Sequence, residues 1–363
     1  MRCGIAELPL HYGSAPRWLF NRMVKLARAI SEIILSEFGT DEFLKRISDP
    51  VWFQSLGCVL GFDWHSSGLT TTVCGALKEG LKDIGLEYGL FVAGGKGQTS
   101  RKTPEEIILW AEKLGFVPEP LIYASKLTAK VDSAALQDGY QIYHHTFIGT
   151  KNGKWAVIQQ GMNTETRWAR RYHWLSWEVK DFVVEPHKAI VCHQKGQALN
   201  MVATESEKAR EIATLIACEK PEKTVKIITK IKEIKLPQRH FITLTDINQI
   251  HLKKILTETY YNQPKNFKEL LSISGVGPKT IRALALMSEL IYKTQPSYTD
   301  PVIYSFAHGG KDGHPYPINR REYDKSIMIL ETAIRQAKLG YNEKLSLLRK
   351  LSATQNQLVV SKL

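Results

Sequence analysis

Hydrophobic positions in the first third of the chain follow helical spacing over long stretches. Between residues 17 and 38 the apolar positions fall on one helical face: Leu19, Met23, Leu26, Ile30 and Ile33. A continuous apolar run from Leu56 to Phe62 predicts a buried strand instead. Further helices are expected at about 70–84, 103–114 and 120–136, with a short strand from Tyr88 to Ala93 between the first two.

The pattern then changes to strands. Tyr140–Gly149 and Lys154–Gln160 flank Lys151-Asn152-Gly153, a turn in which glycine supplies the positive φ of a hairpin. We therefore expect an α+β domain over residues 1–220, built around a central antiparallel β-hairpin. The edge of Lys154–Gln160 could pair with a second copy, so a homo-oligomer is possible on this pattern.

The second part of the chain shows helical patterns throughout. Helices are expected at 245–257, 266–272, 278–293, 321–338 and 342–351. These predict an all-α domain over residues 221–351, followed by a flexible tail at 352–363.

Charge separates the same two parts. The chain carries a net charge of +13, and residues 219–363 hold 24 Lys and Arg against 13 Asp and Glu, whereas residues 1–218 hold 25 against 23. This distribution favours a polyanionic partner for the second part. Five cysteines without CxxC spacing indicate a reducing cytoplasm, and the lack of a long apolar run argues against a membrane protein.

The most specific motif is the turn Gly275-Val276-Gly277-Pro278-Lys279-Thr280 between two predicted helices. Glycines at a turn allow close backbone approach, and the following helix N-terminus attracts a phosphate. Lys279, Thr280 and Arg282 would add contacts, while Val276 packs the turn. The stretch resembles the helix-hairpin-helix of DNA repair proteins, which implies sequence-independent binding of the DNA backbone.

The same resemblance leaves a catalytic alternative open. In bifunctional glycosylases of this class a lysine of the motif attacks the sugar, and an aspartate some twenty residues later assists. The matching positions are Lys279 and Asp300, which would give a DNA glycosylase with lyase activity. Asp300 before Pro301 is better explained as a helix N-cap, which accounts for it without catalysis.

Several Asp and His residues of the first part are candidates for metal-assisted catalysis. Asp63 and His65 follow the apolar run, and Asp138 and His144 open the central hairpin. These residue types bind divalent metals that hydrolyse phosphodiesters, so we expect Mg²⁺ or Mn²⁺ at a site formed by these four. Spacing alone is not diagnostic, and each could be a hydrogen-bonded core residue.

Two other loops could contact phosphate. Gly94-Gly95-Lys96-Gly97 follows a short strand, with Lys96 and Arg101 as its cations, but lacks the spacing of a P-loop. Lys311 lies in a Gly- and His-rich segment that could form a second DNA-contacting loop.

The whole chain also resembles a prokaryotic family of unknown function, DUF763, found in archaea and thermophilic bacteria. Matching segments include Gly61-Phe62-Asp63-Trp64-His65-Ser66-Ser67-Gly68, Gly94-Gly95-Lys96-Gly97 and Phe306-Ala307-His308-Gly309-Gly310-Lys311-Asp312-Gly313. The resemblance implies a prokaryotic cytoplasm, where a DNA-binding protein would associate with the nucleoid. Together these features predict a metal-dependent DNA nuclease acting in repair or processing. A glycosylase with lyase activity and a non-enzymatic DNA-binding protein are the alternatives.

Overall fold

The computed structural model describes residues 15–62, 66–192, 195–233, 248–302, 304–305, 320–337, 340, 343–349 and 351. Its helices are α1 (Arg17–Ser48), α2 (Pro50–Val59), α3 (Gly68–Gly80), α4 (Ile84–Tyr88), α5 (Gln98–Arg101), α6 (Thr103–Leu114), α7 (Glu119–Lys130), α8 (Glu207–Ala217), α9 (Pro221–Glu233), α10 (Gln249–Asn262), α11 (Phe267–Ser272), α12 (Pro278–Tyr292) and α13 (Arg320–Gln336). The strands are β1 (Leu90–Lys96), β2 (Leu136–Gln137), β3 (Gln141–Thr150), β4 (Trp155–Asn163), β5 (Trp168–Leu175), β6 (Ala189–Cys192), β7 (Gln197–Asn200), β8 (Ser297–Thr299) and β9 (Tyr304–Ser305).

A mixed sheet of order β1-β3-β4-β5-β6-β9 forms the centre of the molecule. Its first five strands are antiparallel, and only β9 joins in parallel to β6. The predicted hairpin is confirmed as β3–β4, and Gly153 in its turn has a φ of 82°. β4 pairs on both sides, with β3 and with β5, so the expectation that its edge joins a second copy is wrong.

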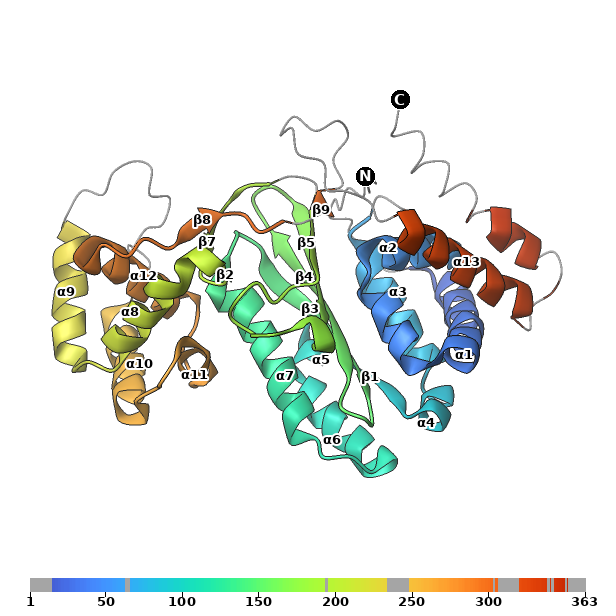
Figure 1. Cartoon of the computed structure of the whole chain (residues 1–363), viewed down its shortest axis with the longest axis horizontal. Coiled ribbons are helices and arrows are strands. Elements are labelled where there is room, and N and C mark those ends of the chain that lie inside the picture. Colours follow the sequence, from blue (N-terminus) through green and yellow to red (C-terminus); the bar gives the residue numbers. More distant parts are fainter. Residues whose placement is uncertain are drawn as a thin grey trace.

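Both faces of this sheet are covered by helices, as Figure 1 shows. One face buries alternate residues such as Leu90, Val92 and Ile158 against α1, α2 and α3, and α13 packs on α1. The other face buries Phe147, Trp174 and their neighbours against α6 and α7. Two successive residues of one strand therefore lie in different cores. This alternation determines which candidate site residues can contact one another.

A second group of helices, α8 to α12, lies at one end of the molecule, with α1 to α3 toward the other (Figure 1). The small sheet β2-β7-β8 joins this group to the central sheet. The group includes α11, the turn after it and α12, the segment that resembles a helix-hairpin-helix in sequence and is called the hairpin below.

Two further expectations from the sequence need correction. The apolar run Leu56–Phe62 is not a strand, because its first part belongs to α2. Asp49 caps that helix by accepting hydrogen bonds from the N–H groups of Val51 (2.9 Å) and Trp52 (2.8 Å). The residues 221–351 are also not all-helical, because β8 and β9 return to the two sheets.

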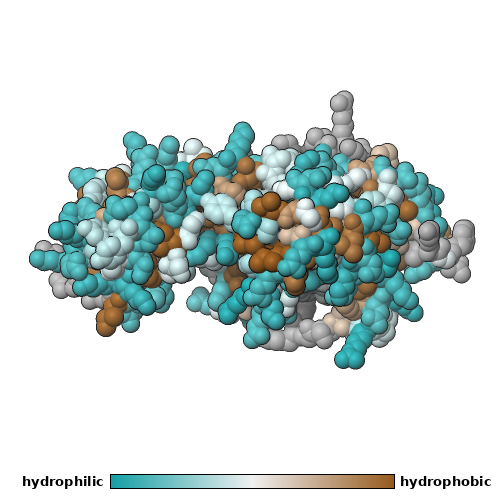
Figure 2. Space-filling view, turned by 90° about the horizontal axis from the view of Figure 1, so that it is seen from below, coloured by the Kyte–Doolittle hydropathy of each residue, from teal (hydrophilic) through white to brown (hydrophobic). Residues whose placement is uncertain are grey.

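The surface combines hydrophilic ends with a more hydrophobic middle. Seen from below, hydrophobic side chains gather over the centre of the molecule (Figure 2). Exposed apolar side chains include Ile108, Leu109 and Val117, which belong to α6 and the loop after it. Within the described ranges, no helix combines the length and the apolar character that crossing a bilayer requires.

Candidate nucleic-acid interface

The hairpin motif forms a tight turn whose backbone faces solvent. Gly275 has a φ of 84°, which L side chains rarely adopt, and the N–H of Val276 donates to the carbonyl of Ile273 (3.3 Å). Val276 is fully buried and packs the turn, as expected. Pro278 is the first residue of α12, so this helix begins directly at the turn with its N-terminus exposed.

Gly277 is the N-cap residue of α12 and has extended backbone angles, φ −138° and ψ −171°. Its carbonyl accepts the first helical hydrogen bond, from the N–H of Ile281 (3.0 Å). A Cβ built at Gly277 would meet nothing closer than the carbonyl oxygen of Gly275, at 3.8 Å. Neither conformation nor packing within the described structure requires glycine at this position.

Three side chains attach the turn to the rest of the fold. Gln137, in β2, donates its Nε2 to the carbonyl of Pro278 (2.8 Å) and accepts at Oε1 from Nε of Arg282 (3.0 Å). Lys130, at the end of α7, donates to the carbonyl of Val276. Burial lowers the pKa of Lys130, in keeping with its position between α7 and the turn. The hairpin is thus held by polar contacts to the carbonyl groups of Val276 and Pro278.

Lysine side chains lie near the turn, but one of the residues expected to contact phosphate is buried. Lys279 is exposed, and Lys254 lines a groove of about 820 Å³ with Ser274 and Gly275. The groove also contains Glu258 and Glu269, so its charge is mixed. Thr280 is buried, and its hydroxyl is not at the surface where a phosphate would bind.

A second feature is a cavity of about 1500 Å³ between α3, the end of β1 and the open ends of β3 and β4. Lys96 lines it, as do Phe62 and Ser66. The predicted catalytic residues Asp63 and His65 lie outside the described residues, but Phe62 and Ser66 flank them in the sequence. Arg101 is exposed on α5 and does not line this cavity.

Beneath the cavity floor lies His144, which is 1% exposed. Its Nε2 bonds the hydroxyl of Thr146 (2.9 Å), and its Nδ1 has no hydrogen-bond partner within the described structure. Burial lowers the pKa of His144 to about 3, with further contributions from His145 and Lys96. A histidine with this pKa is neutral near pH 7 and a weak general base, which argues against the catalytic role expected for it.

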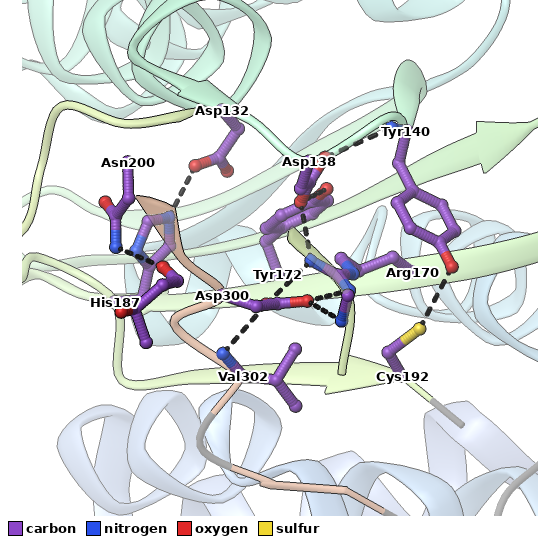
Figure 3. Close-up of polar contacts among 12 residues, drawn as sticks. Asp132, Asp138, Tyr140, Arg170, Tyr172, His187, Cys192, Asn200, Asp300 and Val302 are labelled. Atoms are coloured by element: carbon purple, nitrogen blue, oxygen red, sulfur yellow. Dashed lines mark hydrogen bonds and ion pairs between the residues drawn. The ribbon is translucent and has the colours of Figure 1, made fainter. Parts of the chain in front are cut away.

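Asp138 belongs to a buried charge cluster on the opposite face of the sheet (Figure 3). Its Oδ2 accepts from Arg170 (2.9 Å) and from the hydroxyl of Tyr172 (2.7 Å). Arg170 also holds Asp300 through two bonds, and Asp300 accepts from the N–H groups of Gly196 (2.7 Å) and Val302 (3.1 Å). Asp300 therefore closes a loop next to its own Pro301 and is not a helix N-cap.

The charges of this cluster are mutually dependent. Burial raises the pKa of Asp138, while Arg170 and Tyr172 oppose that rise. Burial works against the guanidinium of Arg170, but Asp138 and its other neighbours more than offset this, so the pKa of Arg170 lies well above its ordinary value. Both carboxylates and the two terminal nitrogens of Arg170 are paired internally, as in a structural ion pair, whereas Nε of Arg170 has no hydrogen-bond partner within the described structure.

A neighbouring buried network centres on Asp132 and was not expected from the sequence. Its carboxylate accepts from Trp174 (2.9 Å) and Gln159 (2.5 Å), and its other oxygen bonds His187 (2.5 Å). The side-chain oxygen of Gln159 in turn forms a hydrogen bond with Nδ1 of His145 (3.0 Å). The signal for these residues was weak, because Asp132 lies within a predicted helix and the strand β5 was missed.

Of the four residues predicted to bind metal, Asp138 and His144 lie in the described part of the chain, and these two do not share one site. His144 pairs in register with Gln160 and Gln160 with Arg171, whereas Asp138 contacts Arg170, so the two side chains lie on opposite faces of the sheet. Within the described ranges, no group of three or more His, Cys, Asp and Glu side chains could hold a metal ion. Asp138 and His144 thus do not fit a shared Mg²⁺ or Mn²⁺ ion, and Lys311, like Asp63 and His65, lies outside the described residues.

Comparison with known proteins adds a family. A model of the DUF763 family, described as "Protein of unknown function", matches residues 4–318. The chain belongs to the DUF763 family. The DUF763 match includes the central sheet, the cavity and the hairpin, and it ends just before α13. No curated protein and no solved structure matches this chain significantly.

Proposed function

We propose that this DUF763 protein binds DNA through the turn Gly275–Lys279, without sequence preference, by holding a backbone phosphate at the N-terminus of α12. The observation that carries the proposal is Gly277. The fold leaves room for a Cβ there, and its backbone is extended, so internal packing does not explain the glycine. Ser, Thr, Asp or Asn would cap the helix at least as well. Close approach of a ligand to the backbone would explain why residue 277 is glycine.

The electrostatics of the region support the same proposal. Pro278 contributes no N–H group, so Lys279 and Thr280 supply the first N–H groups of α12, and the helix dipole favours an anion at this end. Lys279 is exposed beside them. Contacts of this kind read the backbone and not the bases. Such binding would keep the protein on bulk DNA, in keeping with the nucleoid association expected from the sequence.

Equilibrium binding to labelled duplexes of unrelated sequence tests the proposal. We expect similar affinities for all duplexes and a steep fall in affinity with salt. Lys279→Ala should weaken binding to every duplex about equally and reduce the salt slope by about one. Lys25→Ala, an exposed lysine on α1 at the other end of the molecule, is the matched control. The proposal fails if the two variants bind DNA equally well.

A metal-dependent nuclease activity is the second candidate. The observation in its favour is that Phe62 and Ser66, which flank Asp63 and His65, both line the large cavity. Asp138 and His144 are excluded from this proposal by their positions on opposite faces of the sheet. Cleavage of DNA with Mg²⁺ or Mn²⁺, lost in EDTA and in Asp63→Ala, would support it, whereas cleavage that persists in EDTA would reject the metal.

A further inference from the structure

One face of α3 forms a wall of the large cavity. The residues of this face are small or carry hydroxyls: Gly68, Thr71, Thr72 and Gly75. The hydroxyls of Thr71 (3.1 Å) and Thr72 (2.8 Å) donate to the carbonyl of Gly68. Their oxygen lone pairs can therefore accept hydrogen bonds from a molecule in the cavity.

The opposite wall is the loop Gly94–Gly97, which is held rigidly. Lys78 donates to the carbonyl of Gly94 (2.8 Å) and to Glu106 (2.6 Å), and Glu106 accepts from the N–H of Gly94 (2.8 Å). Gly94 has a φ of 87°, and a Cβ there would lie 2.2 Å from the carbonyl oxygen of His145. These contacts fix the backbone at Gly94, and Lys96, two residues later, belongs to the cavity lining.

Among the described residues, the cavity lining is basic on balance. Lys78, Lys96 and Arg167 belong to it, and Glu79 is its acidic residue within that part of the chain. Glu106 neutralises Lys78, and Glu79 lies near Lys82, at 3.3 Å. Lys96 is exposed, and its ammonium group lies 5.9 Å from the ring of Tyr143. A negatively charged group is therefore favoured near Lys96.

Aromatic and apolar side chains complete the lining. Leu19, Phe20, Phe62 and Met162 all contribute. A Cβ at Gly68 would meet the ring of Phe62 at 3.0 Å, and one at Gly75 would meet the ring of Phe20 at 3.5 Å, so both rings lie against α3. A flat, weakly polar molecule could lie against these rings, with its polar edge toward Thr71 and Thr72.

We infer that this cavity binds a nucleotide, with its phosphate at Lys96 and its base against Phe20 and Phe62. A phosphate alone leaves the apolar wall unused, and an apolar ligand leaves the charge of Lys96 uncompensated. A nucleotide satisfies both, and the cavity volume of about 1500 Å³ is ample for one. The inference does not depend on the hairpin, because the cavity lies on the side of the molecule that contains α3 (Figure 1).

Calorimetric titration of the full-length protein with dAMP, deoxyadenosine and inorganic phosphate tests this site. We expect dAMP to bind at least about tenfold more tightly than either fragment. Lys96→Ala should weaken dAMP at least about fivefold and leave deoxyadenosine unchanged, because it removes only the phosphate contact. Phe20→Ala should weaken both by about five- to 100-fold, the range expected for loss of one stacked base.

Lys102→Ala is the matched control, since Lys102 is exposed near the same loop but does not line the cavity. Thermal unfolding of each variant checks whether the fold is retained. If a 5′-phosphorylated single-stranded oligonucleotide competes with dAMP, the ligand is a unit of a DNA strand. If it does not compete, the ligand is a free nucleotide. Binding of dAMP no tighter than inorganic phosphate, or unaffected by Lys96→Ala, would overturn the inference. Lys279→Ala should leave dAMP binding at this cavity unchanged, so failure of this inference and failure of the DNA-binding proposal can be told apart.

Discussion

Arg170 and Asp300 are 130 residues apart in the sequence and form a two-bond ion pair in the interior, with N···O distances of 3.0 and 2.7 Å. Both side chains are 2% exposed. The pair ties the segment after β8 to the central sheet, so residues far apart in the chain share one folding unit. Asp300 is therefore committed to a structural ion pair with Arg170.

Removal of Asp300 should destabilise the protein strongly. Asp300→Ala leaves Arg170 buried with only Asp138 as a charged partner, which should cost about 3 kcal/mol or more. Urea unfolding measures this loss. Asp41→Ala, which removes an exposed carboxylate paired with Lys154, is the control and should cost less than about 1 kcal/mol. Equal effects of the two substitutions would contradict a structural role for Asp300.

The same placement makes a prediction about lyase chemistry. Because Asp300 is committed to Arg170, we expect borohydride to trap no covalent adduct between this protein and abasic DNA. A trapped adduct that disappears in Lys279→Ala would show that the hairpin is catalytic and would contradict this account.

Gln137 carries no charge and contacts the carbonyl of Pro278, so we expect it to position the hairpin and not to pair with a phosphate itself. Gln137→Ala removes two hydrogen bonds that hold the hairpin, so we expect DNA affinity to fall several-fold. The salt slope should stay that of the wild type, because no phosphate contact is removed. Gln98→Ala, an exposed residue on α5, is the control. Unchanged affinity in Gln137→Ala would show that these contacts do not position the turn.

Burial of His144 predicts how stability depends on pH. The folded-state pKa of about 3 lies below the ordinary histidine pKa of 6.5, so the stabilisation is complete well above pH 6.5 and is lost as the pH falls toward 3. Between pH 6.5 and 5, the wild type should lose about 2 kcal/mol more than His144→Gln, since one proton is worth about 1.4 kcal/mol per pH unit. Urea unfolding at several pH values measures the difference. Identical pH dependence in both proteins would mean that His144 is not neutral and buried.

Much of the architecture could be predicted from the sequence, because amphipathic helices and hairpin turns leave local patterns. The hairpin β3–β4 and the long helix α12 were recognised in this way. The helix α2 was not recognised as a helix. It is buried on almost every side, so its apolar residues show no helical spacing. β5 was missed because Arg170 and Arg171 interrupt it with charges that only tertiary pairing satisfies.

The candidate sites were predictable to a similar extent. The turn at Gly275–Lys279 depends on local sequence and was found, although burial of Thr280 was not. The metal site required Asp138 and His144 to meet, and strand alternation instead places them on opposite faces. No local pattern could show that Asp138 pairs with Arg170, because that contact depends on the order of strands in the sheet.

The most direct test of the central claim compares Gly277→Asp with Gly340→Asp. Both glycines are free of positive φ, and each accepts at its carbonyl from the N–H four residues later (3.0 Å). A Cβ at Gly340 meets nothing within 4 Å, so both sites have room for a side chain and both variants change the net charge equally. Asp is a good N-cap, so neither fold should be weakened.

DNA affinity is the deciding measurement, with thermal unfolding as the check on the fold. If a backbone phosphate binds at the N-terminus of α12, the carboxylate in Gly277→Asp occupies its place and repels it, and affinity should fall at least about tenfold relative to Gly340→Asp. Equal affinity in two equally stable variants would show that DNA does not bind at this turn.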